Sequence, residues 1–214
     1  MCVGKFILSE PWIPHLLIGD FDSVNLDVIS EFETKGAKVV KDPDQNTTDL
    51  QKAIYYLYNN RDESHKSEKK KVLIVLGAFG GRMDHTIYAL HLLYKFHSEI
   101  PELFREFQVY FMDKYSMIKL LLPGINHIIP SENFESKNGV GVIPLKEKSK
   151  IQSKGLLYEM GKIYYYPNFA SGEDYEVSEL NFGERISTSN SLNAKKIIIK
   201  TSSPVLWITS LNKL

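Results

Sequence analysis

The character of this 214-residue chain changes near residue 120. Before that point, segments with the apolar spacing of helices alternate with short apolar segments that are typical of strands. After it, the segments are short, aromatic and β-branched, and they are broken by Gly, Pro, Asn and Ser. We therefore expect an α/β domain over residues 1–119 and a smaller all-β domain, sandwich-like or barrel-like, over residues 120–214.

Two segments define the expected α/β domain. Residues 48–60 carry Leu50, Ala53, Ile54 and Leu57 at helical spacing, which predicts an amphipathic helix. The stretch "VLIVLG" at 72–77 is a continuous apolar run, as in strands that are buried on both faces of a parallel sheet. The alternation predicts a parallel, Rossmann-like sheet, and ligands bind such sheets beyond the carboxyl ends of the strands.

The charge balance and the cysteine content exclude several classes of protein. Lys+Arg and Asp+Glu are equal at 26 each, so no global basic field indicates a nucleic-acid or membrane partner. The single cysteine, Cys2, excludes an internal disulfide and fits a reducing compartment. The first residues lack the apolar core of a signal peptide, and no apolar run is long enough to span a bilayer. We expect a cytoplasmic protein.

Paired carboxylates follow the first expected strand, in "LIGDFDSV" at 17–24. In an extended chain the side chains of Asp20 and Asp22 point the same way. Together with a phosphate ligand, two carboxylates suit Mg²⁺. A turn and helix cap explains the same residues, because Asp and Ser are common in both. An Asp-x-Asp pair also occurs in phosphatases of the haloacid dehalogenase type.

Two further polar clusters follow expected strands. In "PDQNTTD" at 43–49, Thr48 and Gln51 form a capping box, and Asp49 falls in the first helical turn. Gln45 and its neighbours supply more hydrogen-bonding groups than a cap requires. In "GAFGGRMD" at 77–84, glycines allow a close approach of backbone to phosphate, and Arg82 is a planar donor. This stretch fits neither the dinucleotide fingerprint nor the Walker pattern, and a glycine turn that packs a strand on a helix is the alternative.

Together, "GDFDS", "PDQNTTD" and "GGRMDH" resemble the thiamine pyrophosphokinase family in order and spacing. In the second half, "LLPG", "GVGVIPL", "KGLLYEM", "ISTSNS" and "SPVLWI" resemble the β domain of its eukaryotic members. The resemblance runs from about His15 to the end of the chain. It implies a catalytic domain that binds ATP and Mg²⁺, a thiamine-binding β domain, and a homodimer with shared active sites. The implied reaction transfers pyrophosphate from ATP to the thiamine hydroxyl, giving thiamine diphosphate and AMP.

The resemblance also assigns roles to individual positions. The implied metal ligands, which are also catalytic, are Asp20, Asp22 and Asp49. Arg82 and Asp84 complete the implied catalytic face. The implied contacts to nucleotide, phosphate or thiamine are Gln45, Thr48, Ser187, Ser189 and Asn190. Tyr158 stands where the family often has Trp, and a cationic thiazolium can stack on either ring.

Family members carry a further strand–helix–strand unit ahead of "GDFDS", with an "ADGGAN"-like turn. Only about 15 residues precede the motif here, and none of them matches. Two alternatives to an active kinase therefore stay open. One is a catalytically weak thiamine-binding homologue with an incomplete ATP site. The other is an unrelated Mg²⁺-dependent phosphatase with Asp20 or Asp22 as nucleophile, which has no use for the "STSN" segment or the β domain.

Overall fold

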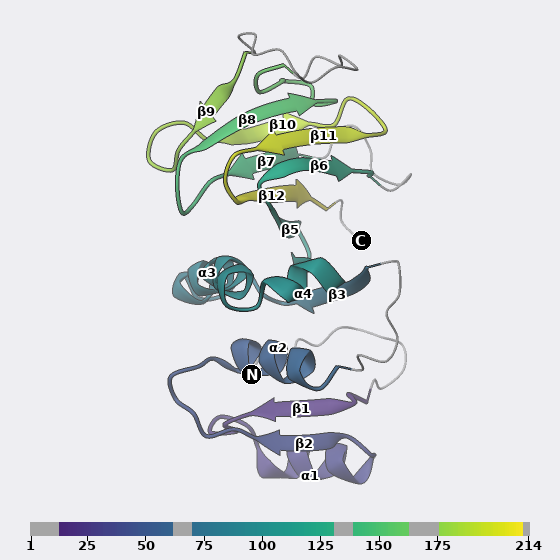
Figure 1. Ribbon diagram of the computed structural model, residues 1–214. Helices are drawn as coiled ribbons and strands as arrows, with labels where there is room; N and C mark the ends of the chain where they lie inside the picture. Colours follow the sequence, from purple (N-terminus) through teal and green to yellow (C-terminus); the bar gives the residue numbers. More distant parts are fainter. Residues whose placement is uncertain (1–12, 62–69, 131–138, 163–175, 212–214) are drawn as a thin grey trace. The chain divides into compact units, whose positions relative to one another are not determined.

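The structure is a computed structural model, and it divides into two compact units, residues 1–69 and 70–214 (Figure 1). Each unit is described by itself. None of the helices in the described part of the chain is long and apolar enough to cross a lipid bilayer. The described residues form four stretches: 13–61, 70–130, 139–162 and 176–211.

Over residues 13–61, the first unit has two parallel strands and two helices in the alternating order that the sequence predicts. Leu16 pairs with Lys38 and Gly19 with Lys41 along the two strands. Leu17, Ile18 and Ala37 are buried, and so is Ile54 of the second helix. The elements are β1 (Leu16–Gly19), α1 (Leu26–Thr34), β2 (Lys38–Lys41) and α2 (Asp49–Asn59).

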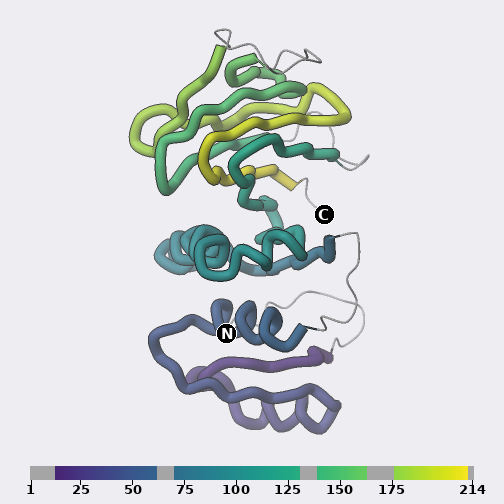
Figure 2. Tube along the Cα trace, viewed as in Figure 1, coloured from purple at the N-terminus to yellow at the C-terminus, as the bar shows by residue number. Residues whose placement is uncertain are grey.

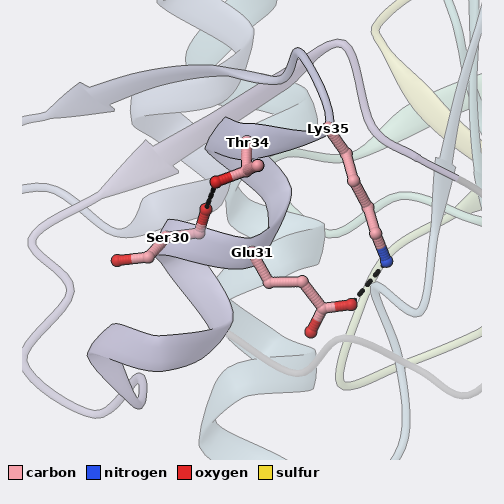
Figure 3. A network of polar contacts seen from close by, with 4 residues as sticks. All are labelled: Ser30, Glu31, Thr34 and Lys35. Carbon is pink, nitrogen blue, oxygen red and sulfur yellow. Dashed lines mark hydrogen bonds and ion pairs between the residues drawn. The ribbon is translucent and has the colours of Figure 1, made fainter.

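Local polar contacts fix both ends of α1. The Asn25 side chain accepts a hydrogen bond from the backbone N–H of Asp27, which caps the first turn. Gly36 follows the helix with φ of +93°, a conformation that glycine adopts without strain. Figure 3 shows two contacts in the last turn, one a hydrogen bond and one an ion pair: Thr34 to the Ser30 carbonyl, and Lys35 to Glu31.

In its described residues, the second unit contains two helices and two sheets. The six-stranded sheet has the order β10-β7-β12-β5-β4-β3, and the four-stranded sheet has the order β6-β11-β8-β9. The helices are α3 (Met83–Glu99) and α4 (Pro101–Glu106). The strands are β3 (Lys71–Leu76), β4 (Phe107–Met112), β5 (Ser116–Leu121), β6 (Gly124–Ile128), β7 (Gly139–Ile143), β8 (Ser149–Lys154), β9 (Ser178–Leu180), β10 (Ser187–Ser191), β11 (Ile197–Thr201) and β12 (Val205–Ser210).

The two sheets of the second unit enclose one apolar core, and the tube in Figure 2 follows the chain between them. Val142 of β7 and Trp207 of β12 face Ile151 of β8 and Ile199 of β11, and each of these side chains is at most 1% exposed. β7, β11 and β12 each place alternate residues in this core: Val140 and Val142, Ile197 and Ile199, and Val205 and Trp207, as in other sandwiches. The second half of the chain is therefore built largely as the expected β-sandwich.

The helices of the second unit pack against β4 and β5 of the large sheet. Val72, Ile74 and Leu76 of β3 are more than half exposed within the described residues, so the expected burial of this strand on both faces is wrong. Phe107, Val109 and Phe111 alternate along β4 and are buried, and Phe96 of α3 is fully buried. The ring of Phe79, in the loop before α3, lies 6.3 Å from the ring of Phe111. This packing fixes the loop between β3 and α3 against the sheet.

The fold is a mixed α/β fold, and the prediction of one parallel sheet over the first domain needs correction. β3 and β4 are parallel, as are β1 and β2, but β5 runs antiparallel to β4 and continues the sheet into β12, β7 and β10. The tight turn at Asp113, whose carboxylate accepts from the backbone N–H of Ser116, reverses the chain directly after β4. A short turn of this kind joins antiparallel strands.

The domain division at residues 119/120 stays a prediction. Residue 119 lies within β5, between its partners β4 and β12. The large sheet thus contains strands from both sides of the expected boundary.

Candidate active site

The carboxylates that follow β1 lie in a turn. Phe21, between them, has φ of +61°, which is unusual for a bulky residue and stores strain on the order of 1 kcal/mol. The backbone N–H of Asp22 donates to Oδ1 of Asp20 over 3.2 Å. The extended geometry expected for these residues is therefore wrong, because the strand ends at Gly19 and the chain turns at once.

Asp49 reaches the end of β1 from α2. Thr48 is the N-cap of this helix, and its hydroxyl accepts from the backbone N–H of Gln51 over 3.4 Å, as the predicted capping box requires. A β-carbon placed on Gly19 would lie 2.8 Å from Oδ1 of Asp49 and 3.3 Å from Oδ2. The carboxylate of Asp49 thus lies against the backbone immediately before Asp20, in space that only a glycine leaves open.

Gln45 orients one of the carboxylates. Its Nε2 donates to Oδ2 of Asp20 over 3.1 Å, although the two residues are 25 positions apart in the sequence. The pKa of the Asp20 carboxyl lies below its ordinary value, chiefly because the backbone N–H of Asp22 donates to it, with smaller contributions from Gln45 and the charge of Lys52. Asp20 is therefore held ionised and in place.

Lys52 has a role in this loop that its sequence motif does not indicate. Its side chain is 4% exposed, and its Nζ donates to the backbone oxygen of Asp42 over 2.8 Å. Lys52 also lowers the pKa of Asp44, after the larger effects of Asn46 and Thr47 donating to that carboxylate. The sequence feature from which this role could be inferred is the position of Lys52 on α2, about one turn after Asp49. Side chains of a helix point toward its N-terminus, so a lysine at this position can reach the loop before the helix.

The described residues contain no preformed group of three or more His, Cys, Asp or Glu side chains that could hold a metal ion. The chemistry of the loops still fits Mg²⁺, which takes one or two carboxylates and fills its remaining positions with water and phosphate oxygens. Asp49 lies against Gly19, and Asp20 follows it directly. Among the described residues, the end of β1 thus offers the carboxylate oxygens of Asp20 and Asp49 as ligands.

Arg82 and Asp84 form an exposed ion pair at the start of α3. The Arg82 Nη2 lies 2.5 Å from Oδ2 of Asp84, and its Nε donates to Oδ1 over 3.1 Å. This bidentate pair holds the pKa of the Asp84 carboxyl below its ordinary value. Gly80 and Gly81, just before it, have positive φ, which lets the chain turn sharply from β3 into the helix.

The hydroxyl-rich strand β10 lies at the edge of the large sheet. Its pairing with β7 shifts register between Ser187 and Asn190, and Ser189 within the shift has φ of +56°. Ser187 is half-buried and Ser189 is exposed. Asn190 is 2% exposed, and its amide hydrogen-bonds the backbone of Tyr158, whose own side chain is 66% exposed.

The structure therefore groups the predicted residues into three places. Asp20, Gln45 and Asp49 meet at the end of β1 in the first unit. In the second unit, Arg82 pairs with Asp84 after β3, which is one edge strand of the large sheet. The β10 residues lie at the opposite edge of that sheet.

These observations define a two-part protein, with an acidic loop in an α/β unit and a hydroxyl-rich edge strand on a β-sandwich. Residues 5–104 match the model of the thiamin pyrophosphokinase catalytic domain, and residues 126–206 match that of the thiamin pyrophosphokinase vitamin B1 binding domain. The chain belongs to the thiamine pyrophosphokinase family.

Curated relatives and solved structures agree with this assignment. The chain is 31% identical over 196 residues to thiamin pyrophosphokinase 1 of Caenorhabditis elegans, covering 91% of this chain and 69% of that protein. It is 29% identical over 202 residues to thiamine pyrophosphokinase 1 of Arabidopsis thaliana, covering 94% and 66%. The chain thus spans about two thirds of the length of these relatives.

The fold is also similar to that of solved structures. The thiamin pyrophosphokinase from Candida albicans superposes with a TM-score of 0.72 at 22% identity, covering 94% of this chain and 74% of that one. The yeast thiamin pyrophosphokinase superposes with a TM-score of 0.73 at 20% identity, covering 95% and 72%. At these identities the likeness concerns the fold.

Proposed function

We propose that this chain is a thiamine pyrophosphokinase, which transfers the diphosphate group of ATP to the hydroxyl of thiamine. The thiamine hydroxyl gives up its proton as its oxygen attacks the β-phosphorus, the bond from that phosphorus to the α,β-bridging oxygen breaks, and AMP leaves with that oxygen. The observation that carries the proposal is the order of the two matches, catalytic then vitamin B1 binding, each over a half with its own polar site. The lone cysteine of the sequence fits a cytoplasmic setting.

The acidic loops of the first unit are the proposed Mg²⁺ and phosphate site. Asp20, Asp22 and Asp49 would hold the ion, with Gln45 orienting Asp20 through its hydrogen bond. When bound, Mg²⁺ neutralises phosphate charge and so stabilises the charge that develops during transfer. Thr48 and the N-terminus of α2 present backbone N–H groups on the same side, where an anion is favoured.

In the second unit, Arg82 is the residue proposed to donate hydrogen bonds to the phosphates of ATP. Its guanidinium is exposed and presently paired with Asp84, so its planar donors are already oriented at the start of α3. A phosphate group offers the same bidentate geometry as the carboxylate. Asp84 would then position Arg82 for the nucleotide.

The thiamine side is proposed to lie along β10. The hydroxyls of Ser187 and Ser189 supply hydrogen bonds, and the exposed ring of Tyr158 supplies a face for a flat cation. Asn190 was expected to contact thiamine as well, but its amide is already engaged with the backbone of Tyr158.

A homodimer with shared sites is supported by the order of the large sheet. Arg82 follows β3 at one edge, and Ser187 begins β10 at the other. Five strand spacings of about 4.8 Å separate these edges by roughly 24 Å, which exceeds the reach of one side chain. The exposed Leu157, Tyr158 and Ile186 beside β10 give a second copy an apolar surface to cover.

The test is incubation with ATP, Mg²⁺ and thiamine, followed by separation of the products. We expect AMP and thiamine diphosphate in equal amounts. Asp49→Asn should abolish their formation without unfolding the protein, because an amide cannot supply the charge of the carboxylate. Asp27→Asn, an equal change in the exposed first turn of α1, is the control and should leave the rate unchanged.

Free phosphate as the main product would instead favour the phosphatase alternative. Thiamine binding without AMP formation would favour the weak thiamine-binding homologue. Each outcome separates one of the three readings from the others.

A further inference from the structure

The buried side-chain amide of Asn190 holds the turn that carries Tyr158 through hydrogen bonds to its backbone. We infer that Asn190 is a positioning residue, which fastens the backbone of Tyr158 and acts on thiamine only through that residue. This inference rests on the proposed function and deepens it. It also replaces the expectation that the Asn190 amide contacts the ligand itself.

Three hydrogen bonds occupy the Asn190 side chain. Its Oδ1 accepts from the backbone N–H groups of Tyr158, over 3.0 Å, and Ser191, over 2.8 Å. Its Nδ2 donates to the backbone oxygen of Tyr158 over 2.7 Å. The side chain thus pairs with both polar backbone groups of one residue, as a neighbouring strand would. At 2% exposure, one N–H is left over, and a direct contact with thiamine would have to use it.

The irregular end of β10 explains why Asn190 faces inward. The register against β7 shifts between Ser187 and Asn190, and Ser189 has φ of +56° at the shift. Such a bulge changes the face to which the following side chain points. The strain at Ser189 is therefore coupled to the burial of the amide.

The carboxylate of Glu159 also holds this turn through hydrogen bonds. The Glu159 carboxylate accepts from the Ser153 hydroxyl and, over 2.6 Å, from the backbone N–H of Gly155. The Ser153 oxygen in turn accepts from the backbone N–H of Met160 over 2.7 Å. Ser153 is 1% exposed and Glu159 is exposed, so this network runs from the surface into the sandwich.

Backbone pairing continues the support before Tyr158. The N–H of Leu157 donates to the oxygen of Ser191 over 2.8 Å, and Leu156 forms a β-bridge with Leu192. Residues on both sides of Tyr158 are thus held, while its ring stays 66% exposed. A platform whose backbone is already ordered costs a ligand less conformational entropy on binding.

The test combines two variants in a double-mutant cycle. Asn190→Asp keeps the acceptor oxygen but replaces the donor to the Tyr158 carbonyl with a repelling oxygen. We expect KM for thiamine to rise about tenfold, with kcat and KM for ATP changed less than about threefold, because only binding of the flat cation is affected. In a Tyr158→Ala background the same substitution should have no further effect on KM.

The two roles of Asn190 predict opposite results. If its amide contacts thiamine directly, Asp would attract the cation, so KM would fall or stay, and the effects of the two substitutions would multiply. Either result would overturn the inference. Asn193→Asp makes the same charge change at an exposed position three residues on, and it should leave KM unchanged.

Amide hydrogen exchange tests the hydrogen bonds between Asn190 and the backbone of Tyr158 without any need for enzyme turnover. In the full chain without ligands, Asn190→Ala, which removes the acceptor of the Tyr158 N–H, should speed exchange at the Tyr158 amide at least about tenfold and leave the Trp207 amide of β12 unchanged. Unchanged exchange at Tyr158 would overturn the inference. If the unsubstituted chain forms no thiamine diphosphate, the proposed function fails, but this measurement still decides whether Asn190 holds the backbone of Tyr158.

Discussion

Gly19 is the residue at which the absence of a side chain bears most directly on the acidic site. Its α-carbon borders the carboxylate of Asp49, which arrives from another element. Asp20 follows in the chain, so a shift at Gly19 disturbs two of the three proposed metal ligands. The sequence offered only an apolar run that ends at a glycine, and it could not indicate what lies against that glycine.

Gly19→Ala should lower the rate of thiamine diphosphate formation at least about tenfold while leaving the melting temperature within a few degrees. The added methyl would lie 2.8 Å from Oδ1 of Asp49, and the carboxylate can move away by rotation at little cost in stability. A displacement of about 1 Å at a catalytic centre can cost up to two orders of magnitude in rate. Steady-state kinetics and thermal unfolding measure the two effects.

Gly139→Ala is the matched control, because its added methyl would meet only Ser210 Oγ, at 3.4 Å. It should change neither quantity. Full activity in Gly19→Ala would show that the position of Asp49 against β1 does not matter for transfer.

Helices and strands show which parts of the fold a sequence can reveal. α2 was predictable because Thr48 caps it and its apolar residues repeat at helical spacing. α4 was missed because its six residues, beginning at Pro101, are too few to establish a period. The antiparallel continuation at β5 was missed because an apolar strand does not specify the direction of its neighbour.

The candidate site was predictable to a similar extent. Asp20 and Asp49 could be found because each follows a strand in a polar cluster, and the structure brings both to the end of β1. The roles of Gln45, Lys52 and Glu159 depend on contacts that only the folded chain makes. Sequence spacing carries no signal for such contacts.

Thr48→Val should destabilise the protein by about 1 kcal/mol, because it removes the hydroxyl that caps α2 and keeps the shape. Thr48→Ser retains the oxygen and should cost only a few tenths of a kcal/mol. Chemical denaturation of both variants makes the comparison. Equal stabilities for Val and Ser would show that this cap does not contribute.

Lys119, on β5 between β4 and β12, predicts an effect of pH on stability. Its pKa lies below the ordinary 10.5, first because of burial and then because of the charge of Lys70. No carboxylate in the described part of the chain pairs with it, and its Nζ lies 5.6 Å from the centre of the Tyr110 ring. The charged form is therefore disfavoured by folding.

Lys119→Met should raise the free energy of unfolding at pH 7 by about 1 kcal/mol, because it removes a desolvated charge. Folding lowers this pKa, so the folded chain loses the proton first as pH rises, and the penalty of the lysine fades as the pH rises through the folded pKa towards 10.5. The advantage of Met should accordingly shrink between pH 7 and pH 10. Lys195→Met, in an exposed turn, should show no such trend. An advantage that stays constant with pH would contradict the assignment.

The arrangement of the complete chain bears on assembly. Arg82 follows β3, and Tyr158 bonds Asn190 of β10, so the two residues lie beside opposite edges of the large sheet. Under the proposed function, a site that uses both draws its residues from two subunits. Arg82→Gln and Tyr158→Ala should each be weakly active alone. An equal mixture of exchanging subunits should regain about a quarter of the activity, because half of the dimers are mixed and each has one intact site.

That recovery is measured by mixing the two purified variants and following AMP formation over time. A mixture no more active than its components would place Arg82 and Tyr158 in one subunit's site, or would leave the chain a monomer. Sedimentation of the unsubstituted chain at micromolar concentration separates those two explanations.

The most direct measurement of the proposed reaction uses ATP labelled with ³²P at the β-phosphorus. Attack at that atom predicts that the label moves into thiamine diphosphate, in step with the release of unlabelled AMP and only when thiamine is present. Label that stays in ADP would show transfer of the γ-phosphoryl group alone. Label released without any in thiamine diphosphate would show hydrolysis, and either result would contradict the assignment of this chain as a thiamine pyrophosphokinase.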